Sequence, residues 1–158
     1  MSEVFEIDPY AGVGKLKFGM SPDEVAQSLG PPDDVDIDAE GEIREYRNDN
    51  GLQTVYSTDD KRLVEVGFSS NISTLAFKKT ALFTNKPLDV LRLLSAADKQ
   101  PYELLGFIVL LNLGITLTGF HDKAADERAV TAFARGRWDS MKERLKPFKL
   151  SGTEKTLT

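Results

Sequence analysis

The sequence contains no cysteine. This absence excludes disulfides, thiolate nucleophiles and cysteine-ligated zinc sites, and it is typical of proteins from a reducing compartment. Long hydrophobic runs are also missing: the most apolar segment, Leu104–Leu113, has ten residues, whereas a membrane-spanning helix needs roughly 20. The first residues do not combine a basic segment with an apolar one, so no signal peptide is expected. We therefore expect a cytoplasmic protein that does not bind membranes.

Histidine and the common catalytic motifs are scarce. His121 is the only histidine, and its neighbour Asp122 would point to the opposite face of a strand, so the pair is interpreted as part of a turn. The acids that follow residue 33 begin like an EF-hand loop, but Gly41 stands at the eighth position instead of the sixth. Segment 12–15, GVGK, lacks the spacing and the hydroxyl of a P-loop. We expect no catalytic residue, no metal and no cofactor; a hydrolase that uses the acids is the least favoured alternative.

Charge is distributed unevenly along the chain. Residues 1–70 include 16 acidic and 6 basic residues, whereas residues 71–158 include 9 acidic and 14 basic ones. An acidic first part disfavours nucleic acid and favours a basic protein partner, mainly by speeding their encounter. The only tryptophan, Trp138, lies in a basic segment. We expect Trp138 in the core or in an interface, with the surrounding cations pairing with the acidic first part.

The acidic run after Pro32 is the predicted partner-binding site, because exposed carboxylates can attract a basic protein surface. Val35 and Ile37 alternate with these acids, so part of the run is expected to be an exposed strand. Two further acids belong to a predicted turn nearby in sequence. The predicted partner-binding residues are Asp33, Asp34, Asp36, Asp38, Glu40, Glu42, Glu45, Asp59 and Asp60.

A short helix with both ends specified is predicted near the N-terminus. Ser21 is a favoured N-cap residue, and Glu24 stands three positions later, so the two can form a capping box. Pro22 suits the first helical position, and Gly30 can adopt the left-handed conformation that ends the helix. A similar spacing of Phe, Pro, Val and Leu recurs later. The matching positions are Phe18, Pro22, Val25 and Leu29 in the first copy and Phe83, Pro87, Val90 and Leu94 in the second.

Segments with period-two alternation follow both predicted helices, and turn-forming residues separate them. The predicted strands are 42–47, 52–57 and 63–69 after the first helix, and 106–111, 115–120 and 128–134 after the second. We therefore predict an α+β fold of two tandem halves, each a helix plus a three-stranded antiparallel meander, which form one sheet with the helices on one face.

This fold is predicted to occupy a single domain over residues 1–150, with pseudo-repeats over about 12–70 and 76–135. Ser140 and Glu143 indicate a second capping box, so a C-terminal helix is predicted over 140–146. A single helix over 124–145 is the alternative for this region, because Val130 and Trp138 have helical spacing. Residues 151–158 are predicted to be a polar tail.

The pattern Gly19-Met20-Ser21-x-x-Glu24-Val25-x-x-x-Leu29-Gly30-x-Pro32 resembles a module of the outer-membrane-assembly lipoproteins. The tandem arrangement resembles the β-lactamase inhibitory proteins, and the small acidic chain resembles the immunity proteins of bacterial polymorphic or contact-dependent toxins. The last resemblance implies a non-catalytic protein that binds and neutralises a basic toxin domain. The alternatives are a module that binds a small molecule or lipid in an apolar pocket, and an interaction protein of envelope assembly.

Overall fold

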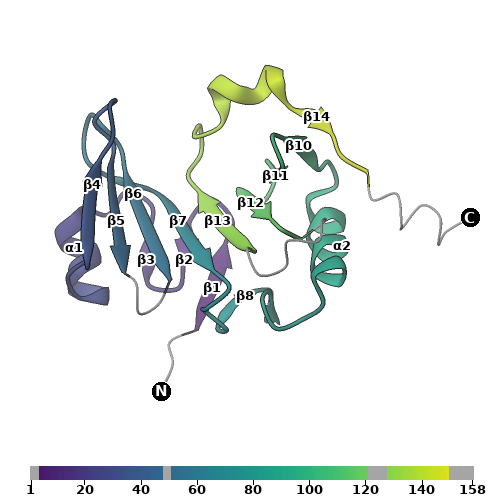
Figure 1. Cartoon of the computed structure of the whole chain (residues 1–158), viewed down its shortest axis with the longest axis horizontal. Coiled ribbons are helices and arrows are strands. Elements are labelled where there is room, and N and C mark those ends of the chain that lie inside the picture. The colour runs from purple at the N-terminus through teal and green to yellow at the C-terminus, as the bar shows by residue number, and fades with distance from the viewer. Residues whose placement is uncertain (1–3, 48–50, 121–127, 150–158) are drawn as a thin grey trace, which may run out of the picture.

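Strands are the predominant regular secondary structure of this chain (Figure 1). The computed structural model describes residues 4–47, 51–120 and 128–149, and within them 14 strands form two sheets. The larger sheet contains, in spatial order, β14 (Lys146–Pro147), β10 (Tyr102–Leu104), β11 (Phe107–Leu110), β12 (Ile115–Thr118), β13 (Ala129–Phe133), β7 (Leu63–Ser69), β6 (Leu52–Tyr56), β5 (Ile43–Arg47) and β4 (Asp34–Ile37). The smaller sheet contains β3 (Leu16–Lys17), β2 (Gly12–Val13), β1 (Phe5–Asp8), β8 (Leu75–Phe77) and β9 (Thr80–Ala81). The helices within the described residues are α1 (Pro22–Leu29), α2 (Pro87–Asp98) and the 3-10 helix η2 (Asp139–Arg144).

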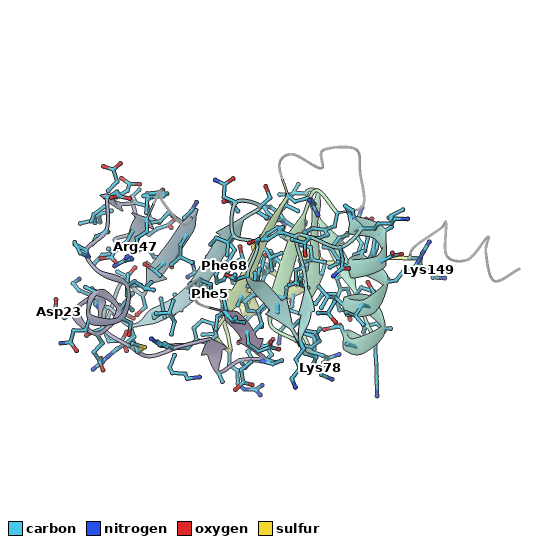
Figure 2. The ribbon with its side chains drawn as sticks, turned by 90° about the horizontal axis from the view of Figure 1, so that it is seen from below. Phe5, Asp23, Arg47, Phe68, Lys78 and Lys149 are labelled. Atoms are coloured by element: carbon cyan, nitrogen blue, oxygen red, sulfur yellow. The ribbon has the colours of Figure 1, made fainter. Side chains whose placement is uncertain are left out.

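The hydrophobic core lies on one face of the nine-stranded sheet. Val66 and Phe68 of β7 point into it, because side chains two positions apart share a face. Phe5 of β1 packs against Phe68 with 5.4 Å between the ring centroids, and Figure 2 shows the two side by side. Val25 of α1 and Leu91 of α2 belong to the same buried cluster. The smaller sheet and both α-helices therefore cover one face of the larger sheet.

Strand pairs between residues far apart in sequence join the first and second parts of the chain. In the larger sheet, β13 pairs antiparallel with β7, with Val130 opposite Phe68. In the smaller sheet, β1 pairs parallel with β8, with Phe5 opposite Leu75. The two parts thus share both sheets as well as the core.

Helix α1 begins and ends where its capping residues predict. The Ser21 hydroxyl accepts a hydrogen bond from the Glu24 N–H at 3.2 Å, and the Glu24 carboxylate accepts one from the Ser21 N–H at 2.9 Å. The predicted capping box is therefore confirmed. Gly30 follows the last turn with φ of 84° and ψ of 178°. The positive φ is one that a residue with a Cβ adopts at a cost, but the predicted left-handed helical conformation is wrong, because ψ is extended.

The predicted α+β fold class is wrong. Strands do occur near the six predicted segments, but the described chain is mostly β, with two sheets instead of one and few helices. Six of its strands have only two or three residues. They are β2, β3, β8 and β9 of the smaller sheet and β10 and β14 of the larger one. A strand that short contains no period-two run that a sequence pattern can reveal, and it forms because distant backbone groups meet.

The predicted C-terminal helix over 140–146 is also wrong. Residues Asp139–Arg144 form a 3-10 helix whose N-cap is Trp138, no side chain caps it, and Lys146–Pro147 is a strand paired with β10. No residue of η2 is buried. A short α-helix is stable mainly when an apolar face packs against the protein. Residues 139–144 have no such buried face, so an α-helix is not favoured there. The rival single helix over 124–145 is excluded by β13, which occupies its middle.

Candidate protein-binding site

Strand β4 forms one end of the nine-stranded sheet, beside α1 at the left of Figure 1. All four of its residues are exposed. Val35 and Ile37 keep 55% and 64% of their surface accessible to solvent. The strand therefore combines a sheet edge with exposed carboxylates and exposed apolar side chains.

The pairing of β4 with β5 sorts these side chains between the two faces of the sheet. Val35 lies opposite Glu45, and Ile37 lies opposite Ile43, on the face that carries the core. Asp36 lies opposite Arg44 on the other face, and Asp34 shares that face because strand side chains alternate. The edge is thus apolar on the core face and acidic on the other.

Asp33 is also exposed and directly precedes β4. The other exposed acids of the predicted set lie in two turns that connect neighbouring strands of this sheet. Glu40 follows β4, and Asp59 and Asp60 lie between β6 and β7. The Thr58 hydroxyl donates a hydrogen bond to the Glu40 carbonyl at 3.0 Å, so the two turns are in contact. The tertiary structure therefore places the predicted turn acids close to the predicted strand acids.

Asp38 and Asp60 shape these turns. The Asp38 carboxylate accepts hydrogen bonds from the N–H groups of Glu40 at 2.9 Å and Glu42 at 3.0 Å, a pattern by which aspartate stabilises turns. Asp60 accepts a hydrogen bond from the Ser57 hydroxyl. Both side chains therefore stabilise the turns that contain the other exposed acids, in addition to contributing negative charge.

Glu45 is buried, with 6% of its surface accessible, and so cannot contact a partner on this surface. Its carboxylate accepts hydrogen bonds from Tyr56 at 2.7 Å and Thr54 at 3.2 Å, and it forms an ion pair with Arg47 at 3.2 Å. Alternation along β5 turns Glu45 toward the core face of the sheet. The prediction of Glu45 as a partner-binding residue is not supported by this placement.

Arg47 connects this buried cluster to α1. Its guanidinium donates two hydrogen bonds to the Gly30 carbonyl, at 2.9 and 3.2 Å, at the end of the helix. A buried guanidinium is stable only when its donors are satisfied. Burial and the adjacent Glu45 carboxylate raise the pKa of the Tyr56 hydroxyl, with burial the larger cause, so that hydroxyl stays a donor. The cluster fixes β5, and with it β4, relative to α1.

Glu42 also forms an internal ion pair. The Arg137 guanidinium donates to both oxygens of Glu42, with 3.0 Å for one of them, and to Glu65 of β7 at 2.8 Å. The hydrogen bond from Arg137 holds the pKa of Glu42 below its ordinary value, and Glu42 in turn raises the pKa of Arg137. The predicted pairing of the basic segment with the acidic first part is confirmed at this residue.

A second candidate feature is a surface pocket of about 430 Å³ where the chain leaves β13. Tyr10, Phe133 and Trp138 contribute its aromatic walls, and the Arg135 guanidinium stacks on the Tyr10 ring at 4.5 Å from the centroid. The Tyr10 hydroxyl donates to the Leu111 carbonyl, and burial raises its pKa. Of these residues, only Trp138 and the basic segment around it were singled out in the sequence, because Tyr10 lies far away in the chain.

The described residues contain no group of three or more His, Asp or Glu side chains that could hold a metal ion. His121 and Asp122 lie outside the described residues. No helix in the described ranges is long and apolar enough to cross a membrane. The acids of β4 and its turns therefore define a surface of distributed charge and not a site where ligands converge.

Comparisons with protein families, with curated proteins and with solved structures each found no match.

Proposed function

We propose that this chain is a protein-binding protein without catalytic activity of its own, and that it neutralises a bacterial toxin domain by covering a basic surface of that domain. The observation that carries this proposal is the exposed strand β4, with Asp34 and Asp36 on one face and Val35 and Ile37 on the other. Such a strand can contribute both charge attraction and apolar burial to an interface.

The distribution of acids supports a role in guiding a basic partner. Asp34 and Asp36 are exposed on β4, while Glu40 and Asp59 are exposed in the two adjoining turns. Exposed charges of one sign accelerate the encounter with an oppositely charged protein more than they increase the final affinity. We therefore expect fast association that slows as salt is added.

The test reverses the two strand acids in the double variant Asp34→Lys/Asp36→Lys. The partner is first captured from the native host with the wild-type chain as bait, and association rates are then measured at low and high salt. We expect the variant to associate at least about tenfold more slowly at low salt, with a smaller difference at high salt.

The matched control is Asp89→Lys/Glu143→Lys, which changes the net charge by the same amount on exposed residues of α2 and η2, away from β4 (Figure 1). We expect it to change the association rate by less than about threefold, because these charges lie away from the β4 surface and contribute less to the potential there. Equal rates for the wild type and the β4 variant at low salt would refute this electrostatic role.

The pocket at Tyr10 supports a second candidate function, the binding of a small planar anion. Its aromatic walls and the cation Arg135 are the groups that such a ligand needs. Trp138 is the only tryptophan in the chain, so its fluorescence reports on this pocket alone. Titration with benzoate should change that fluorescence in the wild type and much less in Arg135→Ala; no change in either would exclude this candidate.

A further inference from the structure

The backbone of β4 has hydrogen-bonding groups that β5 does not use. In an antiparallel pair, residues alternate between those whose N–H and C=O face the neighbouring strand and those whose groups face away. The Asp38 N–H donates to the Glu42 carbonyl at 3.0 Å, and the pair Asp38–Glu42 continues the register of β4 and β5. Because every second residue repeats this arrangement, the backbone N–H and C=O groups of Asp36 and Asp34 also face β5. The N–H and C=O groups of Val35 and Ile37 therefore face the open edge of the sheet.

The opposite end of the same sheet is closed to strand addition. Strand β14 consists of two residues, Lys146 and Pro147. Proline has no N–H to donate, and lysine on an edge strand discourages pairing with another chain. The residues of β4 include neither proline nor lysine, and the strand is twice as long. Of the two edges, only β4 offers a run of backbone groups that another strand can pair with.

We propose that β4 is extended by a strand of the partner, which adds antiparallel to its open edge. This inference rests on the proposed function and specifies how the partner is held. In such a pairing, side chains directly opposite one another lie on the same face. The added strand would place apolar side chains opposite Val35 and Ile37 and basic side chains opposite Asp34 and Asp36. The partner strand therefore alternates apolar and basic residues.

A second copy of this chain does not meet that requirement. If two β4 strands paired antiparallel through Val35 and Ile37, the register would place Asp36 opposite Asp36 and Asp34 opposite Asp38. Like charges directly opposite one another destabilise a strand pair. Arg44, the cation directly opposite Asp36 on that face, interacts with Gln53 at 3.4 Å. Charge complementarity therefore favours a basic strand over self-association.

The test uses the full chain, isotope-labelled for NMR, and a synthetic peptide of four Lys-Val repeats with blocked ends. We expect the peptide to shift the amide signals of Val35 and Ile37 and to slow their hydrogen exchange at least about tenfold. Two further peptides are methylated on backbone nitrogen, one at the valines and one at the lysines. In the proposed arrangement, the valine N–H groups face β4, so only methylation at valine should abolish binding.

The outcomes separate this inference from the proposed function. Equal binding of all three Lys-Val peptides would overturn strand addition while leaving charge attraction intact. Loss of binding only on methylation at lysine would overturn the antiparallel arrangement. If a Glu-Val peptide bound as well as the Lys-Val peptide, or if neither bound, the charge complementarity on which both proposals rest would be refuted.

A variant of the protein gives an independent check. Val35→Pro removes one outward-facing N–H and leaves the hydrogen bonds to β5 in place, whereas Val35→Ala removes more of the apolar side chain and keeps the N–H. We expect Val35→Pro to bind the Lys-Val peptide at least about tenfold more weakly than Val35→Ala. Equal affinities in two variants with unchanged NMR spectra elsewhere would overturn the proposal.

Discussion

The two edge strands of the nine-stranded sheet, β14 and β4, differ in how open they are to pairing with another chain. At β14, a two-residue strand with Lys146 and Pro147 leaves little for another chain to pair with. At β4, four exposed residues keep their outward backbone groups, and carboxylates are the only charges on the strand. An acidic edge rejects copies of itself but accepts a basic strand, so the difference indicates a surface that selects its partner by charge.

Buried polar anchors lie behind both ends of the sheet. Next to β4, Arg47 and Glu45 tie β5 to the end of α1. At the other end, Asp98, with 1% of its surface accessible, closes α2 and accepts hydrogen bonds from the N–H groups of Asn112 and Leu113 at 2.8 and 3.0 Å. Each cluster fixes a helix to the sheet. Substitutions in each cluster test which of the two contributes more to the free energy of unfolding.

The largest effect is expected from Arg47→Ala. Removing the guanidinium leaves the Glu45 carboxylate buried without its ion-pair partner and the Gly30 carbonyl without its two donors, which we expect to cost about 4 kcal/mol. Urea unfolding measures this loss. The control is Arg92→Ala, which removes an exposed ion pair with Asp89 and should cost less than about 0.5 kcal/mol. A cost below about 1 kcal/mol for Arg47→Ala would contradict the anchoring role.

Asp98→Ala should have the next largest effect. The substitution leaves the partly buried N–H of Asn112 and the buried N–H of Leu113 without an acceptor, and we expect the free energy of unfolding to fall by about 3 kcal/mol. Asp98→Asn keeps an acceptor oxygen and should cost less. If the two variants were equally stable in urea unfolding, the hydrogen bonds of Asp98 would not be what stabilises this end.

Arg137→Met should have a moderate effect, because Arg137 pairs with Glu42 and Glu65 on the partly exposed face of the sheet. We expect a loss of about 2 kcal/mol at neutral pH. The pKa of Glu42 is lowered in the folded state, so its ion pair stabilises the fold above the ordinary glutamate pKa, and this contribution is lost as the pH falls through the lowered value.

Wild type and Arg137→Met should therefore approach each other in stability under acidic conditions, as measured by urea unfolding between pH 7 and pH 3. A difference between them that stays constant over this range would show that Glu42 does not titrate as part of this ion pair.

The smallest effect on stability is expected from Asp34→Lys/Asp36→Lys at the acidic edge itself. Both side chains are exposed, but the lysine at position 36 would lie opposite Arg44, so we expect the free energy of unfolding to change by less than about 1 kcal/mol. Thermal unfolding checks this. A larger loss would mean that the acids of β4 stabilise the fold, and it would weaken their assignment to partner binding.

Local signals in the sequence specified some of these features. The Ser21 and Glu24 capping box defined α1, and the alternation of Val35 and Ile37 with acids indicated an exposed strand. In contrast, Glu45 was grouped with the exposed acids, because sequence position does not reveal which face of β5 is covered. The pocket at Tyr10 could not be predicted either, since Tyr10 and Arg135 meet only through the packing of distant strands.

The sequence by itself determined the ends of α1 and the concentration of acids in the first part of the chain, because these depend on neighbouring residues. Only the tertiary structure decided that the chain forms two sheets, that Glu42 and Glu45 are used internally, and that β4 is a free edge. The physical reason is that strand pairing and burial join groups far apart in sequence, and a local pattern contains no record of which partner each group will meet.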